Sequence, residues 1–166
     1  RRPLTTSPLV LPKHLYPRLA ATGPPGGRNT NEKPMRTLKK QYAETSGREL
    51  AAACARIALD TKAEDLVVLD VRGLASFTDY FVIMSGRSTR HVQGLAEAIE
   101  AELRAKRISS KHSEGLREGL WVLLDFGDVV VHVFYHESRS FYDLEGLWHD
   151  AAKIDPEELV AAAPNP

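Results

Sequence analysis

Four residues with metal-binding side chains lie close together in the sequence: Asp125, Asp128, His132 and His136. Carboxylates and imidazoles are groups that bind zinc and similar ions. The apolar residues around His132 predict a β-strand, in which residues four apart are separated by about 13 Å. His132 and His136 therefore cannot share one ion, and Asp128 in a turn is more often a conformational choice than a ligand. We predict no metal site and no cofactor.

A second candidate is a phosphate site at residues 85–88, Ser-Gly-Arg-Ser, between a predicted strand and a predicted helix. Backbone amides at a helix N-terminus attract anions. The segment has one glycine, however, and neither a Walker lysine nor a full GxGxxG follows it. A small nucleotidyltransferase-like enzyme would use this segment with Asp125 and Asp128, but no Asp-x-Asp pair adjoins it to hold magnesium. A strand-to-helix turn with Ser88 as the helix cap is the favoured interpretation.

Nucleophilic catalysis has little support in the sequence. The single cysteine, Cys54, lies on the apolar stripe of an Ala-rich helix and is predicted to be core. Ser88 is already used as a cap, and the six histidines show no Ser-His-Asp spacing. One cysteine also excludes an internal disulfide and indicates a reducing compartment. We therefore predict no catalytic residues.

Aromatic and acidic residues make up the remaining cluster, which includes both tryptophans of the chain. Aromatic side chains are enriched at binding hot spots, and carboxylates steer a basic partner. We predict that eight residues bind a partner: Trp121, Asp125, His132, Phe134, Glu114, Tyr142, Glu145 and Trp148. For Tyr142 and Trp148 an alternative stays open, in which they only fold a C-terminal helix back onto the sheet.

A β-hairpin must position this cluster. Apolar runs at residues 120–126 and 129–135 flank Gly127-Asp128, and glycine at the first turn position allows a type II′ turn. A two-residue loop fixes the register, so that Trp121 faces Phe134 and the two strands acquire different faces.

One face of the hairpin is almost wholly apolar and is predicted to be core: Leu120, Val122, Leu124, Phe126, Val129, Val131, Val133 and Tyr135. The other face places the Asp125 carboxylate and the His132 imidazole beside Trp121 and Phe134. That mixture predicts a partly wet surface or a second, thinner layer, and we expect the functional contacts there.

Helices and strands are predicted on both sides of the hairpin. Ser46 and Glu49 form a capping-box pattern that begins a helix reaching about residue 61, and Ser88 caps the next helix. Strands are predicted at residues 66–71, 78–85 and 108–112, and helical turns at 138–148 and 156–159. This order predicts an α/β (mixed α+β) fold with a mixed sheet of about five strands and flanking helices. The predicted domain covers residues 46–150, with residues 151–166 as a C-terminal tail.

Charge divides the chain into two parts. Residues 1–40 hold nine Lys/Arg and one Asp/Glu, whereas residues 41–166 hold 13 and 21. Residues 1–45 are basic and rich in Pro and Gly, and are predicted to be disordered. The acidic domain favours a basic protein partner over a direct grip on nucleic acid phosphates.

Composition also bears on localisation. No apolar run approaches the roughly 20 residues that span a bilayer, and the N-terminus lacks an apolar signal core, so we expect a soluble intracellular protein without a membrane partner. Residues 1–34 are alternatively an organellar transit peptide, although their seven prolines oppose the amphipathic helix such peptides need. A further alternative is that Met35 is the start, with the preceding residues a cloning scar or an over-extended reading frame.

Seven segments form a recognisable set of motifs: Asp70-Val-Arg-Gly, Thr78-Asp-Tyr-Phe-Val-Ile, Ser85-Gly86-x-Ser88-x-Arg-His, Glu114-Gly, Trp121-Val-Leu-Leu-Asp125, Gly127-Asp-Val-Val-Val-His132 and Arg139-x-Phe-Tyr-x-Leu-Glu-x-Leu-Trp148. In order and spacing they resemble the ribosomal silencing factor (RsfS, Iojap-related) family over residues 46–150. The resemblance implies a nucleotidyltransferase-like fold without the catalytic acids. It also implies binding to the large ribosomal subunit through its fourteenth protein, which blocks joining of the small subunit and represses translation when nutrients are scarce.

Further expectations accompany this resemblance. The basic extension would contact ribosomal RNA by charge, and an exposed aromatic face would allow a homodimer when the protein is free. The bacterial cytoplasm is the expected location, with a mitochondrion or plastid as the alternative if residues 1–34 are a transit peptide. An assembly factor that holds the large subunit without silencing it is the alternative function, beside the enzyme considered above.

Overall fold

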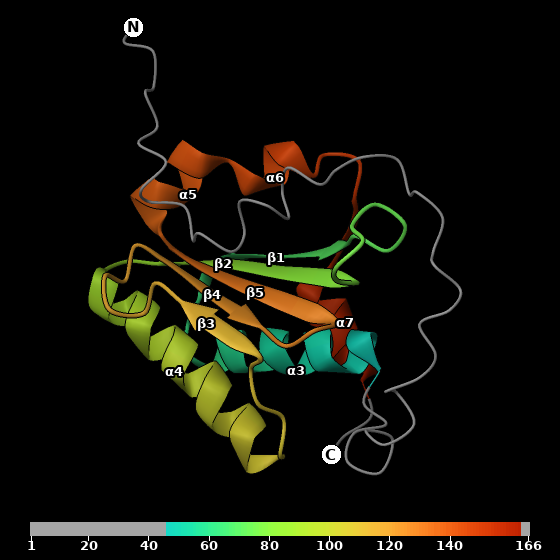
Figure 1. Cartoon of the computed structure of the whole chain (residues 1–166), viewed down its shortest axis with the longest axis horizontal. Coiled ribbons are helices and arrows are strands. Elements are labelled where there is room, and N and C mark those ends of the chain that lie inside the picture. Colours follow the sequence, from blue (N-terminus) through green and yellow to red (C-terminus); the bar gives the residue numbers. More distant parts are fainter. Residues whose placement is uncertain (1–45, 164–166) are drawn as a thin grey trace, which may run out of the picture.

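A six-stranded mixed sheet organises the part of the chain that the computed structural model describes, residues 46–163 (Figure 1). The strands are β1 (Glu64–Asp70), β2 (Tyr80–Gly86), β3 (His112–Glu114), β4 (Trp121–Asp125), β5 (Val129–Tyr135) and β6 (Ala152–Ile154), in the spatial order β3-β4-β5-β2-β1-β6. β2 and β5 pair in parallel, and the other four neighbouring pairs are antiparallel. The predicted mixed sheet is confirmed, whereas the predicted disorder of residues 1–45 lies outside the described residues.

The hairpin of β4 and β5 has the predicted register. Trp121 lies opposite Phe134, and Leu123 lies opposite His132. Gly127 has a φ of 92°, the positive sign that the first position of a type II′ turn requires. The Asp125 carboxylate accepts a hydrogen bond from the Gly127 N–H at 2.8 Å, so this side chain stabilises the turn.

Two long helices cover one face of the sheet, α3 (Gly47–Asp60) and α4 (Thr89–Ala105) (Figure 1). Ser46 and Glu49 form the predicted capping box of α3, and Ser88 accepts a hydrogen bond from the His91 N–H at the start of α4. Seven of the eight residues of the apolar face of the hairpin pack in the core under these helices, as predicted, whereas Leu120 is half-buried and lies outside that core. This is the larger core of the domain.

A second, thinner layer covers the opposite face. It is formed by two short helices, α5 (His136–Tyr142) and α6 (Leu144–Leu147), together with the loop between β1 and β2. Figure 1 shows α5 and α6 on the side of the sheet away from α3 and α4. Asp143 joins the two helices with a φ of 45°, in the left-handed region.

The C-terminal residues agree with the prediction in part. The helix predicted at residues 156–159 is present as α7 (Pro156–Ala162), but β6 was not predicted, and residues 152–162 belong to the fold rather than to a tail. β6 pairs with β1, and Leu159 of α7 is buried in the larger core. The strand predicted at residues 108–112 begins instead at His112. None of the helices within residues 46–163 has the length and apolarity needed to cross a membrane.

Candidate partner-binding surface

Seven side chains form a continuous group of rings between the sheet and the short helices. We call this set the aromatic layer: Phe77, Phe81, Trp121, His132, Phe134, Tyr142 and Trp148. The centroid of the Trp121 ring lies 4.7 Å from that of Phe134 and 4.9 Å from that of Tyr142. Phe81 connects His132, at 5.0 Å, with Trp148, at 5.2 Å. Sequence reasoning therefore identified five of these residues as neighbours, and the fold brings them together.

A hydrogen bond links the two polar members of the layer. The Trp121 Nε1–H donates to His132 Nδ1 at 3.2 Å, and His132 is fully buried. Because Nδ1 accepts this bond, the proton of the neutral imidazole lies on Nε2. The bond gives the Trp121 indole a partner inside an apolar environment, where an unpaired N–H would be costly.

The layer is not the partly wet surface that was one of the two expectations. The exposed fraction is 3% for Trp121, 5% for Asp125 and for Trp148, and 0% for His132 and Phe134. The alternative, a second layer, is what the structure has, because α5 and α6 fold back over the hairpin directly after β5. Trp121, His132 and Phe134 therefore lie beneath this second layer, and Asp125 is buried at the hairpin turn.

The other three residues predicted to bind a partner are partly exposed. The Glu114 carboxylate lies 3.5 Å from His112 Nε2 on the edge strand β3. Burial against Trp121 raises the pKa of Tyr142. Glu145 of α6 accepts a hydrogen bond from Arg139 Nε at 2.8 Å, so its charge is already paired within the fold.

The polar groups of the phosphate-site candidate are likewise engaged inside the protein. Ser85 Oγ accepts a hydrogen bond from Arg139 Nη1 at 2.9 Å, and Ser88 Oγ caps α4. His91 Nδ1 accepts from the Arg87 N–H at 3.1 Å. Within residues 46–163 no group of three or more His, Cys, Asp or Glu side chains is placed to hold a metal ion.

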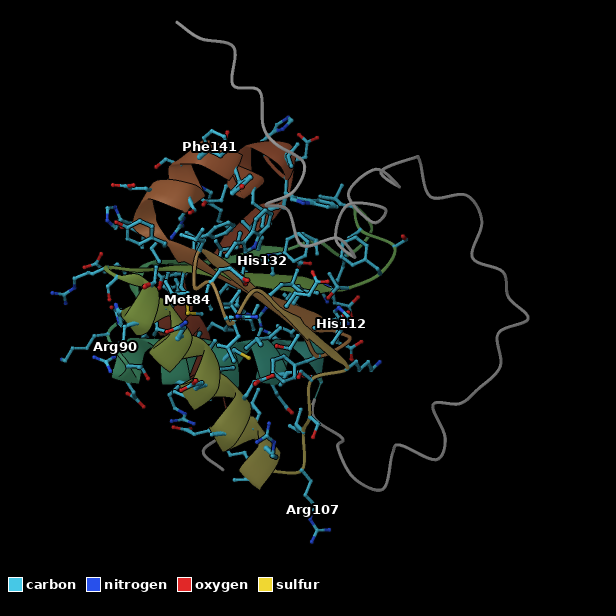
Figure 2. The ribbon with its side chains drawn as sticks, turned by 60° about the vertical axis from the view of Figure 1, so that its left-hand side comes forward. Met84, Arg90, Arg107, His112, His132 and Phe141 are labelled. Carbon is cyan, nitrogen blue, oxygen red and sulfur yellow. The ribbon has the colours of Figure 1, made fainter. Side chains whose placement is uncertain are left out.

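Two exposed apolar residues on α5 and α6 were missed by the sequence reasoning. Phe141 is 41% exposed and Leu147 is 63% exposed, and exposed carboxylates of Glu137, Asp143 and Asp150 belong to the same segment. We call these five residues the outer surface. Figure 2 shows Phe141 at the periphery of the molecule and His132 inside it. The apolar pattern of a seven-residue helix is too short to show which of the neighbouring rings, Phe141 or Tyr142, faces water.

Arg139 was missed as well, although the motif that contains it was noticed. Its side chain is mostly buried, and its guanidinium bonds to three other elements of the fold. The sequence did contain a signal that could have identified it, because Arg139 is a lone arginine in a segment of aromatic and acidic residues, six residues before Glu145.

Comparison with known proteins places this geometry in context. The family described as "Ribosomal silencing factor during starvation" matches residues 44–166. The protein named ribosomal silencing factor RsfS from Bacillus subtilis is 46% identical over 105 residues, which cover 63% of this chain and 86% of that protein. The protein of the same name from Halalkalibacterium halodurans is 37% identical over 116 residues, or 70% of this chain and 99% of that protein.

Two other kinds of relative agree with these matches. A crystal structure of a Chromobacterium violaceum protein superposes with a TM-score of 0.62 at 34% identity, covering 63% of this chain and 88% of that chain. The chloroplastic protein Iojap of Zea mays is 35% identical over 105 residues, covering 63% of this chain and 46% of that protein. The family match extends over most of the sequence and includes the whole described domain, and the chain therefore belongs to the ribosomal silencing factor family.

Proposed function

We propose that this protein binds the large ribosomal subunit through its fourteenth protein and sterically blocks joining of the small subunit, which represses translation when nutrients are scarce. Its relatives are named ribosomal silencing factors, which supports the general role. The mechanism needs no catalysis, because the bulk of the domain occupies the space that the small subunit requires.

The contact surface in this proposal is the outer surface rather than the aromatic layer. Phe141 and Leu147 are large apolar side chains left in water. An exposed apolar patch with polar neighbours marks an interaction site, and we propose that these two residues form one. The exposed carboxylates of Glu137, Asp143 and Asp150 suit a basic protein partner and would steer its approach. The exposure of two large apolar side chains, in a segment that also carries exposed carboxylates, is the observation that carries the proposal.

The predicted site residues then have two kinds of role. Trp121, His132 and Phe134 support the outer surface from beneath, as do Tyr142 and Trp148. Glu114 is exposed enough to meet basic groups of the partner, whereas the carboxylate of Glu145 is paired with Arg139. Asp125 is excluded from direct contact by its burial and its bond in the hairpin turn.

Substitution of Leu147 tests this surface. If Leu147 is a hot spot of the contact, Leu147→Ala should weaken co-sedimentation with purified large subunits roughly tenfold or more, because truncating a hot-spot residue costs about 2 kcal/mol or more. The thermal stability of the Leu147→Ala variant should hardly change, since the Leu147 side chain is mostly exposed. Leu59→Ala is the matched control, because Leu59 is 37% exposed on α3, on the opposite side of the sheet. Equal binding by both variants would remove the outer surface from the proposal.

A subunit-joining assay tests the function itself. Purified large and small subunits mixed with the wild-type protein should form fewer joined ribosomes, and Leu147→Ala should restore joining. Because charges contribute to the contact, raising the salt concentration should weaken binding. If the protein binds large subunits without suppressing joining, steric silencing is wrong and a role in subunit assembly takes its place.

Localisation and free oligomeric state belong to the same proposal. We place the protein in the bacterial cytoplasm, supported by bacterial relatives such as that of Bacillus subtilis. The chloroplastic relatives support an organellar form as the alternative. A homodimer of the free protein would use the same exposed Phe141 and Leu147, so that analytical ultracentrifugation of Leu147→Ala should show less dimer than the wild type.

A further inference from the structure

The short helices that carry the outer surface have little core of their own. α5 contributes no buried residue, and α6 contributes Leu144 alone. The two helices meet at Asp143, which has a left-handed backbone. Helices of this length are not stable by themselves in water, so tertiary contacts must fix their position.

Arg139 supplies contacts that reach from α5 to three other elements. Its Nε donates to Glu145 Oε1 at 2.8 Å, and its Nη1 donates to Ser85 Oγ at 2.9 Å and to the Asp65 carbonyl. Glu145 lies on α6, Ser85 near the end of β2 and Asp65 on β1. The Arg139 side chain is 12% exposed, so its bonds to Glu145 and Ser85 are partly shielded from water, whereas the bond to the Asp65 carbonyl lies at the surface.

An irregularity in β1 presents one of these acceptors. The pairing of β1 with β2 shifts register between Glu64 and Val67, and Asp65 has a φ of 49°. Such a bulge takes a residue out of the regular ladder and redirects its groups, and bulges are common next to functional sites. Here the carbonyl of the bulged residue accepts a hydrogen bond from Arg139.

We propose that Arg139 is a positioning residue for the partner-binding surface. Phe141 follows Arg139 by two residues, and Leu147 follows Glu145 by two. The Arg139–Glu145 pair therefore sets the separation of the two apolar residues, while the bonds to Ser85 and Asp65 set their place relative to the sheet. A lysine cannot replace it, because one ammonium group lacks the planar fork that reaches three acceptors. This inference rests on the proposed function.

Binding and amide exchange together test the inference. Arg139→Lys should bind large subunits roughly tenfold more weakly, because hydrogen bonds from a charged group are lost. Hydrogen exchange should become faster in residues 137–148 and stay unchanged in α4. Arg56→Lys is the matched control, since Arg56 pairs with Asp60 and Glu102 on the opposite side of the sheet. Glu145→Gln, which leaves the bonds to Ser85 and Asp65 in place, should give a smaller change of the same kind.

A double-mutant cycle separates positioning from a general loss of stability. In the Leu147→Ala background, Arg139→Lys should weaken binding by clearly less than tenfold, because one of the two residues it positions is already gone. An equal loss in both backgrounds, or wild-type binding by Arg139→Lys, would overturn the inference. If the wild-type protein does not bind large subunits, the proposed function fails. Unchanged exchange in residues 137–148 of Arg139→Lys and Glu145→Gln would separately show that Arg139 does not position the helices.

Discussion

At the residue scale, removing the hydrogen bond between Trp121 and His132 tests whether Trp121 supports the surface from within or contacts a partner directly. Trp121→Phe removes the Nε1–H donor but keeps an aromatic ring in the layer. We expect the free energy of unfolding, measured in urea, to fall by roughly 1–2 kcal/mol. Binding of the folded variant to large subunits should stay close to wild type. Weaker binding with unchanged stability would instead place Trp121 in direct contact with the partner.

Cys54 allows a second residue-scale prediction, on pH. Burial in α3 raises the pKa of its thiol to about 12, so the folded protein keeps this group neutral. A free cysteine ionises near pH 8.5, and the unfolded chain therefore releases this proton first. The contribution of Cys54 to stability is complete below about pH 8.5 and is lost as the pH rises toward 12.

Two measurements check the prediction for Cys54. The native protein should not react with a thiol reagent at pH 8, whereas the urea-unfolded protein should react with one thiol per chain. Between pH 8.5 and 10, the free energy of unfolding should decrease less in the Cys54→Ala variant than in the wild type. Fast labelling of the native protein would show that the Cys54 thiol is accessible to the reagent and is not buried in the core.

At the element scale, substitution by alanine should have opposite effects on stability at two glycines, Gly86 at the end of β2 and Gly94 within α4. A Cβ at Gly94 in α4 would meet no atom within 4 Å, so Gly94→Ala should raise the free energy of unfolding by about 0.5–1 kcal/mol. A Cβ at Gly86 would lie 2.9 Å from the Val92 backbone nitrogen, and Gly86→Ala should lower stability. Urea unfolding of both variants measures the two signs. A stabilised Gly86→Ala would show that β2 and α4 can separate at this junction.

The elements that sequence reasoning predicted share one property, a signal contained within a short segment. The capping box of Ser46 and Glu49 begins α3, and Gly127 sets the register of the hairpin without help from distant residues. The cover over Trp121 depends instead on where the chain travels after β5. That path is fixed by long-range contacts such as the bonds from Arg139 to Ser85 and Asp65, which no local pattern encodes. β6 was missed for the same reason, because a segment of three residues is too short to show a strand pattern and becomes a strand only beside β1.

At the scale of the whole molecule, the two faces of the sheet differ in how firmly they are covered. α3 and α4 together bury twelve side chains over one face, whereas α5 and α6 bury Leu144 alone. Regions with few buried contacts open at lower free energy than the rest of a domain. The face that we propose for the partner is therefore the more adaptable one, and α3 and α4 provide the rigid support behind it.

The division of charge along the chain leads to the last prediction. Residues 1–40 carry a large excess of Lys and Arg, and the remainder carries an equal excess of carboxylates. Contacts between basic side chains and RNA phosphates release counterions, so the binding constant falls as salt rises. In a plot of the logarithm of the binding constant against the logarithm of salt concentration, each such contact makes the slope steeper by about 0.7–0.9. If the extension touches ribosomal RNA, deleting residues 1–40 should weaken binding to large subunits and make this slope shallower. Replacing Lys13, Arg18, Lys39 and Lys40 with glutamine in the full chain should give a change in the same direction, because length is kept and only charge is removed. An unchanged slope in both variants would mean that the acidic domain binds alone, through its outer surface, without help from the extension.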